Sequence, residues 1–118
     1  MRLWVHNAYQ LHHPIPRFIG GNLSQDLYKV DSLLHKGAGA SFHNLLAEDL
    51  RAAGFPRVGG VGGSYADWEL FFRRNPGSQR QALDILLNRA RDFDFVNGTQ
   101  FLSKTWANIV KGNFRLIP

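Results

Sequence analysis

The sequence HHPIPRFIGG at residues 12–21 decides the fold of this chain. Residues 3–11 mix apolar and polar positions, which predicts a strand that leads into the histidine pair. The two prolines of the stretch exclude a helix and require an extended or looped path, and the closing glycines predict a turn. Residues 27–30 (LYKV) predict a second short strand. We therefore expect two strands joined by a proline-containing, glycine-closed loop.

The rest of the chain predicts helices. Residues 35–40 (HKGAGA) form a connection broken by glycines, and Ser41 is expected to cap a helix that runs to about residue 53, before Gly54 and Pro56. Three more helices are expected: Ser64 to Arg74 with a Ser64–Asp67 capping box, residues 79 to about 95 capped by Ser78, and a last helix to about residue 111 capped by Thr99. The expected class is α+β, with a small β-rich third before a helical two-thirds.

Composition limits the classes of protein to consider. With 118 residues, of which 44% are hydrophobic and 19% charged, the chain suits one globular domain with a modest core. No apolar run approaches the roughly 20 residues that span a bilayer, and the first residues lack a signal peptide's apolar stretch. The aromatic residues of the expected helices are assigned to the core: Trp68, Phe71, Phe72, Phe101 and Trp106.

The charge balance and the lack of cysteine bear on ligands. The chain has no cysteine, so it can form neither disulfides nor thiolate metal sites. A transition-metal site must therefore use His, Asp or Glu. With 14 Lys and Arg against 9 Asp and Glu, the formal net charge is +5. This excess of positive charge favours polyanionic partners such as nucleic acid.

Four of the five histidines lie between residues 12 and 43, and they suit a one-metal phosphodiesterase site. Such a site needs a divalent ion on the phosphate, a base for the attacking water and positive charge nearby. Imidazole serves as a metal ligand and as a base near neutral pH. Neighbouring side chains of a strand point to opposite faces, so His12 and His13 are expected to divide these two tasks. His43, in the first turn of its helix, is expected as a second ligand.

His35 is the uncertain ligand. In one continuous helix, His35 and His43 would lie about 12 Å apart along the axis, too far to share an ion. Gly37 and Gly39 disfavour a continuous helix, and a loop that folds back would bring His35 within range. The alternative is that His35 is a capping or loop residue.

The run "LHHPIPRFIGG…QDLYKV…LLHKGAGASFHNLL" resembles the His-Me finger (HNH, ββα-metal) nucleases, especially the C-terminal toxin domains of bacterial polymorphic toxins of the Rhs type. It is also similar in pattern to the nuclease colicins. This resemblance covers about residues 9–50, and "GGVGGSYADW" and "RNPGSQRQALD" are similar to Rhs-type toxin domains less specifically. It implies a single nuclease toxin domain over residues 1–118. A ββα-metal finger would occupy about residues 9–53, with a C-terminal helical extension at about 64–112.

The resemblance also implies roles for individual residues. His12 would bind the metal, His13 would be the general base, His43 would be a ligand and His35 a possible third. The cofactor would be one divalent ion, Mg²⁺ or Zn²⁺. The chain departs from the family in two ways: its late histidines stand eight positions apart rather than one turn, and the Asn of the second strand is absent, with Asp26 the nearest polar residue and Leu27 near its place. The residue that orients the base therefore stays unassigned.

Three basic residues of the same region are candidates for phosphate binding: Arg17, Lys29 and Lys36. The alternative for each is a solvent-exposed charge that binds no ligand. The implied function is a metal-dependent endonuclease on DNA that acts as an interbacterial toxin. It would be the C-terminal domain of a larger secreted protein, delivered by a bacterial secretion system into the target-cell cytoplasm and neutralised by a cognate immunity protein, with no membrane partner.

Two alternatives stay open at this point. The first is an RNase toxin of the same fold, since a histidine pair and basic loops suit that substrate too. The second is a non-catalytic nucleic-acid-binding module with a structural, His-only metal site.

Overall fold

The computed structural model describes residues 9–35 and 39–118. In chain order the elements are β1 (Tyr9–His12), β2 (Tyr28–Asp31), α1 (Ser32–His35), α2 (Phe42–Ala52), α3 (Tyr65–Arg74), α4 (Ser78–Asn97) and α5 (Phe101–Val110). This arrangement of helices and one antiparallel sheet confirms the α+β class. His6, Lys36 and residues 3–8 of the expected first strand lie outside the described residues. None of the described helices is long and apolar enough to cross a membrane.

The two strands pair antiparallel and determine which side chains enter the interior. His12 lies opposite Tyr28 and Gln10 lies opposite Val30, while the intervening Leu11 lies opposite Lys29. His12 and Val30 are buried, whereas Leu11 and Lys29 are exposed. This alternation follows from the two-residue period of a strand. Both expected strands are confirmed, with β1 extending to His12 itself.

Helix α2 follows the predicted amphipathic pattern. Phe42, Leu46 and Leu50 recur every four residues, are buried, and face the core on the side where α2 packs against α4. Gly54, at a φ of 92°, takes the left-handed conformation that ends the helix. Helix α1 was not expected from the sequence. It is a single turn that follows β2 directly, with the backbone N–H of Leu33 donating to the Asp31 carboxylate at 2.8 Å.

The later helices begin where expected, but two of the predicted caps are wrong. The Ser64–Asp67 capping box at α3 is present. Helix α4 is preceded by Gly77 in the left-handed conformation, and Ser78 is already its first, buried residue. Helix α5 is capped from a distance, because the carboxylate of Asp94 accepts the backbone N–H groups of Phe101 and Leu102 at 2.8 Å each. Thr99 instead donates its hydroxyl to that same carboxylate.

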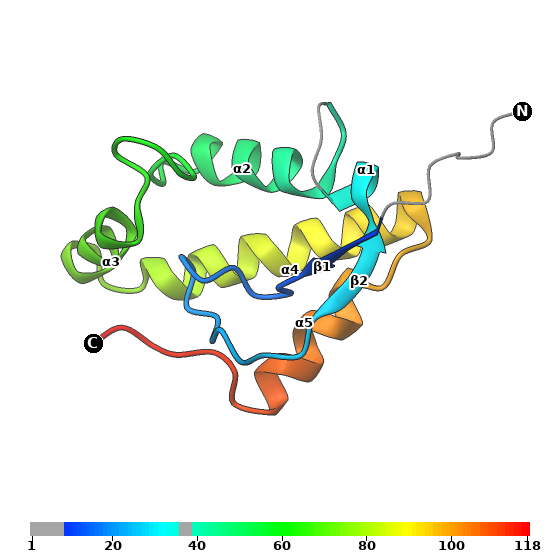
Figure 1. Cartoon of the computed structure of the whole chain (residues 1–118). Helices are drawn as coiled ribbons and strands as arrows, with labels where there is room; N and C mark the ends of the chain where they lie inside the picture. The colour runs from blue at the N-terminus through cyan, green and yellow to red at the C-terminus, as the bar shows by residue number, and fades with distance from the viewer. Residues whose placement is uncertain (1–8, 36–38) are drawn as a thin grey trace, which may run out of the picture.

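Helix α4 is the centre of the molecule. Figure 1 shows it running through the middle, with α2 along one side and α5 on another, and both pairs of helices are in contact. Phe42 of α2 and Phe101 of α5 stack at 4.1 Å between ring centroids, and each meets Phe93 of α4 edge-on. The core assignment of Trp68, Phe72 and Phe101 is confirmed. That of Trp106 is wrong: it is half exposed, because α5 buries a different face through Phe101, Thr105 and Asn108.

Three buried amide side chains hold the loop between the strands. Gln25 binds both the backbone N–H and the carbonyl of Ile15, at 2.9 and 2.8 Å. Gln79 donates to the carbonyls of Ile19 and Arg115, and Asn108 binds the backbone of Asp26 on both sides. The chain end adds a bridge between Gly21 and Phe114. An irregular loop is thus fixed, because its polar backbone groups find partners inside the protein.

Candidate metal centre

Three imidazoles converge at one end of the sheet. His12 comes from the end of β1, His35 from the end of α1 and His43 from the first turn of α2. One ring nitrogen from each lies within 4.8 Å of the others. The Nε2 atoms of His35 and His43 are 2.8 Å apart. The structure therefore brings together the three residues that the sequence nominated as metal ligands, and their ligation of an ion stays a prediction.

The interruption of the helix between residues 35 and 43 produces this meeting. Helix α1 ends at His35, and α2 begins only at Phe42, after Gly39 at a φ of +70°. His35 and His43, eight positions apart in the sequence, are thereby in hydrogen-bond contact. His12 approaches from β1, and its ring centroid lies 4.8 Å from that of His35 and 5.4 Å from that of His43. The expectation that His35 comes within range of His43 is met. The expected loop itself lies partly outside the described residues, at residues 36–38.

His12 is a buried imidazole without a hydrogen-bond partner among the described residues. Its side chain is 1% exposed, and neither of its ring nitrogens is paired. Burial, helped by the nearby His43, His35 and His13, lowers the pKa of His12 from 6.5 to about 2. His12 is therefore neutral at physiological pH, which is the state that binds a metal. A nitrogen that binds a cation must offer a lone pair that is neither protonated nor used in a hydrogen bond. The neutral, unpaired His12, buried beside two other imidazoles, meets this requirement.

The spacing of the nitrogens also fits an ion. In a tetrahedral zinc site the nitrogens lie about 2.0–2.1 Å from the ion, and so about 3.3 Å from each other. The observed separations, from 2.8 Å up to 4.8 Å, lie on both sides of that value. Three-fold coordination would therefore require the closest pair of nitrogens to move apart and the most distant pair to approach. Three imidazoles would leave a fourth position open, as catalytic zinc sites do.

Gln10 orients one of the three imidazoles, and sequence reasoning missed it. Its Oε1 atom lies 2.7 Å from Nδ1 of His35. With Oε1 as the acceptor, His35 carries its proton on Nδ1, so its Nε2 lone pair is directed toward His43 and the cluster. The available signal was the two-residue period of the strand, which places Gln10 on the same face of β1 as His12.

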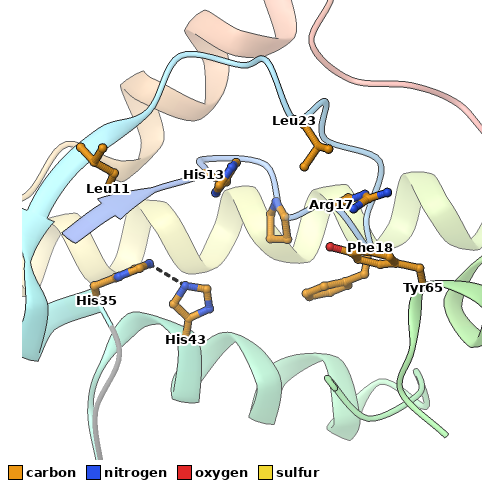
Figure 2. A pocket seen from close by; sticks show the side chains of 9 residues that line it. Leu11, His13, Arg17, Phe18, Leu23, His35, His43 and Tyr65 are labelled. Atoms are coloured by element: carbon orange, nitrogen blue, oxygen red, sulfur yellow. Dashed lines mark hydrogen bonds between the residues drawn. The ribbon is translucent and has the colours of Figure 1, made fainter. Parts of the chain in front are cut away.

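A cavity of about 380 Å³ opens beside the cluster, and Figure 2 shows its lining side chains. His35 and His43 line it together with the exposed His13 and Arg17, which belong to the loop after β1. His12 is buried in the interior, whereas His13, the first residue after β1, lines the cavity, so the two side chains take different sides as expected. The candidate base thus shares a cavity with two of the candidate ligands.

Tyr65, which lines the cavity, is a second residue that sequence reasoning missed. It is the first residue of α3, and the guanidinium of Arg17 lies over its ring, with Cζ 4.2 Å from the centroid. Lys29 does not line the cavity. It lies on the exposed face of β2, with Nζ 5.0 Å from the ring centroid of Tyr9.

The polar residue nearest to the family's missing Asn does not orient the base. Asp26 forms a surface ion pair with Lys111, and its backbone is bound by Asn108. It is absent from the described cavity wall, as is every other carboxylate. The cavity is therefore positive or neutral along its described lining, which suits an anionic ligand.

No family model, curated protein or solved structure matches this chain. The geometry of its own side chains is what supports a function.

Proposed function

We propose that this chain is a metal-dependent endonuclease, with DNA as the preferred substrate and with β1, β2 and α2 acting as a ββα-metal finger. One observation carries the proposal: the imidazoles of His12, His35 and His43 converge beside a cavity that the exposed His13 and Arg17 also line. In the proposed finger β1 supplies His12 and α2 supplies His43, while His35 comes from the single turn α1 that lies between β2 and α2.

His12, His35 and His43 would together hold one divalent ion. Three neutral imidazoles suit Zn²⁺ or another transition metal better than Mg²⁺, which prefers oxygen ligands. Of the two ions that the resemblance allows, we therefore favour Zn²⁺. When bound, the ion supplies positive charge that stabilises the phosphate in the transition state.

His13 is the proposed general base. Its side chain is exposed in the cavity, so its ring is accessible to a water molecule. It takes a proton from that water as the oxygen attacks phosphorus, while the bond from phosphorus to the leaving oxygen breaks. Arg17, from the same loop, pairs with a non-bridging phosphate oxygen, as guanidinium groups do. Lys29 and Lys36 would bind phosphates further along the nucleic-acid strand.

The central experiment is nicking of supercoiled plasmid with and without added Zn²⁺ or Mg²⁺. We expect metal-dependent nicking that His13→Ala abolishes, while circular dichroism and metal content stay those of the parent protein. Full cleavage by that variant would assign the base to another residue. Cleavage of RNA but not DNA under the same conditions would select the RNase alternative.

The burial of two ligands gives a reason to keep the binding-module alternative. His12 and His35 are only 1% and 6% exposed, as is common in structural metal sites. In that case chelation would unfold the chain, and no nucleic acid would be cut. The cavity beside the cluster makes the catalytic interpretation the better one.

The biological role that we propose is that of an interbacterial toxin domain. It would be the C-terminal part of a larger secreted protein, reach the target-cell cytoplasm through a secretion system, and be blocked there by an immunity protein. Expression in a bacterial host checks this role: growth should stop with the parent chain and continue with His13→Ala. Equal growth of both would contradict it.

A further inference from the structure

Exposed apolar side chains gather around the cavity of the candidate metal centre. Leu11 and Leu23 are 60% and 63% exposed, Tyr65 is 49% exposed, and all three line the cavity. Large apolar side chains that stand together in solvent are typical of a binding surface. Phosphate gains nothing from contact with them. The ligand of this cavity should therefore carry an apolar surface beside its charge.

The Arg17–Tyr65 pair offers that ligand a flat, charged surface. Because the guanidinium lies over the tyrosine ring, its plane is held in place. Figure 2 shows the pair on the cavity wall beside Phe18, across from the His35–His43 pair. Aromatic rings and arginine planes are the groups on which unpaired bases stack in complexes with single-stranded nucleic acid. The edge of the same guanidinium carries the donors that bind phosphate.

We infer that the Arg17–Tyr65 pair is a stacking platform for one unpaired base, so that this site takes single-stranded nucleic acid in preference to duplex. The inference rests on the proposed nuclease function for its class of ligand. The phosphate beside the stacked base then lies next to His13 and the imidazole cluster, all of which line or adjoin the same cavity.

A continuous duplex fits this cavity less well. Its bases are paired and stacked, so its backbone presents sugar and phosphate to a protein, and the apolar wall would meet no partner. The cavity volume of about 380 Å³ belongs to the range of small-molecule sites and suits one nucleotide. The net charge of +5 and the lack of carboxylates on the described wall favour the approach of a polyanion.

Binding to metal-free protein tests the platform without depending on cleavage. The probes are a fluorescent single-stranded oligothymidine, the same oligomer with abasic sites, and a hairpin duplex with the same number of phosphates, each measured by fluorescence anisotropy in the presence of EDTA. The variants are Tyr65→Ala, Tyr65→Phe and Arg17→Lys. Trp106→Ala is the matched control, because Trp106 is 48% exposed and stands on α5, outside the cavity wall.

We expect the oligothymidine to bind more tightly than the abasic oligomer or the hairpin. Tyr65→Ala should weaken its binding by a factor between about 5 and 150, which is the usual effect of losing one stacked base. The abasic oligomer should respond little to that change. Tyr65→Phe and Trp106→Ala should bind like the parent, while Arg17→Lys, which keeps the charge but loses the plane, should bind less tightly.

Equal affinity of the parent protein for the base-bearing and abasic oligomers would overturn the inference, as would tighter binding of the hairpin or no binding at all. This comparison needs no variant, so it decides even if Tyr65→Ala fails to fold. Base-dependent binding without any metal-dependent cleavage would refute the nuclease and leave the platform standing. Cleavage of duplex with no effect of Tyr65→Ala would support the nuclease and refute the platform.

Discussion

Oε1 of Gln10 lies 2.7 Å from Nδ1 of His35, which links strand β1 to the candidate metal centre from outside the ligand set. Such a contact sets which nitrogen of an imidazole is free to bind an ion, and it limits the rotation of the ring. Gln10 is an exposed residue of the strand, so its side chain is available for substitution without disturbing the core.

We expect Gln10→Ala to lower the affinity for Zn²⁺ by about 10- to 100-fold, which is the usual effect of removing a group that orients a metal-bound histidine. Titration against a competing chelator measures this affinity. Leu33→Ala is the control, since it removes an exposed side chain from α1, the helix that carries His35. An unchanged affinity in Gln10→Ala would mean that the hydrogen bond does not orient the ligand.

The convergence of His12, His35 and His43 predicts that metal stabilises the fold. At free Zn²⁺ about 100 times the dissociation constant, the free energy of unfolding should rise by about 2.7 kcal/mol, because only the folded chain gathers the three ligands. Thermal unfolding with and without Zn²⁺ measures the shift. His43→Ala should abolish most of it. A shift of the same size in that variant would place the ion elsewhere.

The position of Arg17 at the cavity predicts a local effect on activity. Arg17→Ala should lower plasmid nicking at least tenfold, because a charge-assisted phosphate contact contributes about 1.5–3 kcal/mol. Lys104→Ala makes the same change in net charge on the exposed surface of α5 and should leave nicking nearly unchanged. Equal losses in the two variants would show that overall charge matters and the position of Arg17 does not.

The buried His12 predicts acid sensitivity of the metal-free protein. Burial lowers the pKa of His12 to about 2, whereas in the unfolded chain it is near 6.5. Below pH 6.5 the unfolded chain therefore binds a proton at His12 that the folded chain does not, and stability falls as pH falls. The loss should reach about 1.4 kcal/mol per pH unit from this residue and should vanish above pH 6.5.

Urea unfolding of the parent and of His12→Gln, between about pH 4.5 and 7, measures this dependence. As pH falls, the free energy of unfolding should decrease less steeply in the variant than in the parent. The two slopes should differ by at most the contribution of one proton, about 1.4 kcal/mol per pH unit. Parallel curves for the two proteins would mean that His12 is protonated, or already exposed, in the folded state at low pH.

The close approach of the Gly21 backbone predicts a steric requirement in the loop. A Cβ atom at residue 21 would lie 1.9 Å from the carbonyl oxygen of Ile15. Gly21→Ala should therefore lower the free energy of unfolding by about 3 kcal/mol or more, because backbone would have to move. Gly54→Ala, whose φ is 92° and whose Cβ would meet open space, should lower it by only about 1–2 kcal/mol. Urea unfolding distinguishes the two, and equal values would show that the loop yields easily.

The strands, the amphipathic helix α2 and the capping box of α3 were predictable from the sequence. Each depends on interactions within a few residues: the two-residue period around His12, the four-residue period of Phe42, Leu46 and Leu50, and the reciprocal bonds of Ser64 and Asp67. Helix α1 escaped prediction because four residues carry no periodic pattern. The cap at Ser78 was wrong because α4 already begins at that residue, after Gly77. The cap at Thr99 was wrong because Asp94, a residue of the preceding helix, binds the free N–H groups of α5 from across the turn.

The sequence by itself determined which residue types are available for a metal site and on which elements most of them stand, since these follow from composition and local periodicity. Only the tertiary structure decided that His35 returns to within 2.8 Å of His43, that Gln10 binds His35, and that Tyr65 lies beneath Arg17. These contacts join segments that no local pattern relates. They depend on how the core closes around α4, because α2 and α5 both pack against that helix.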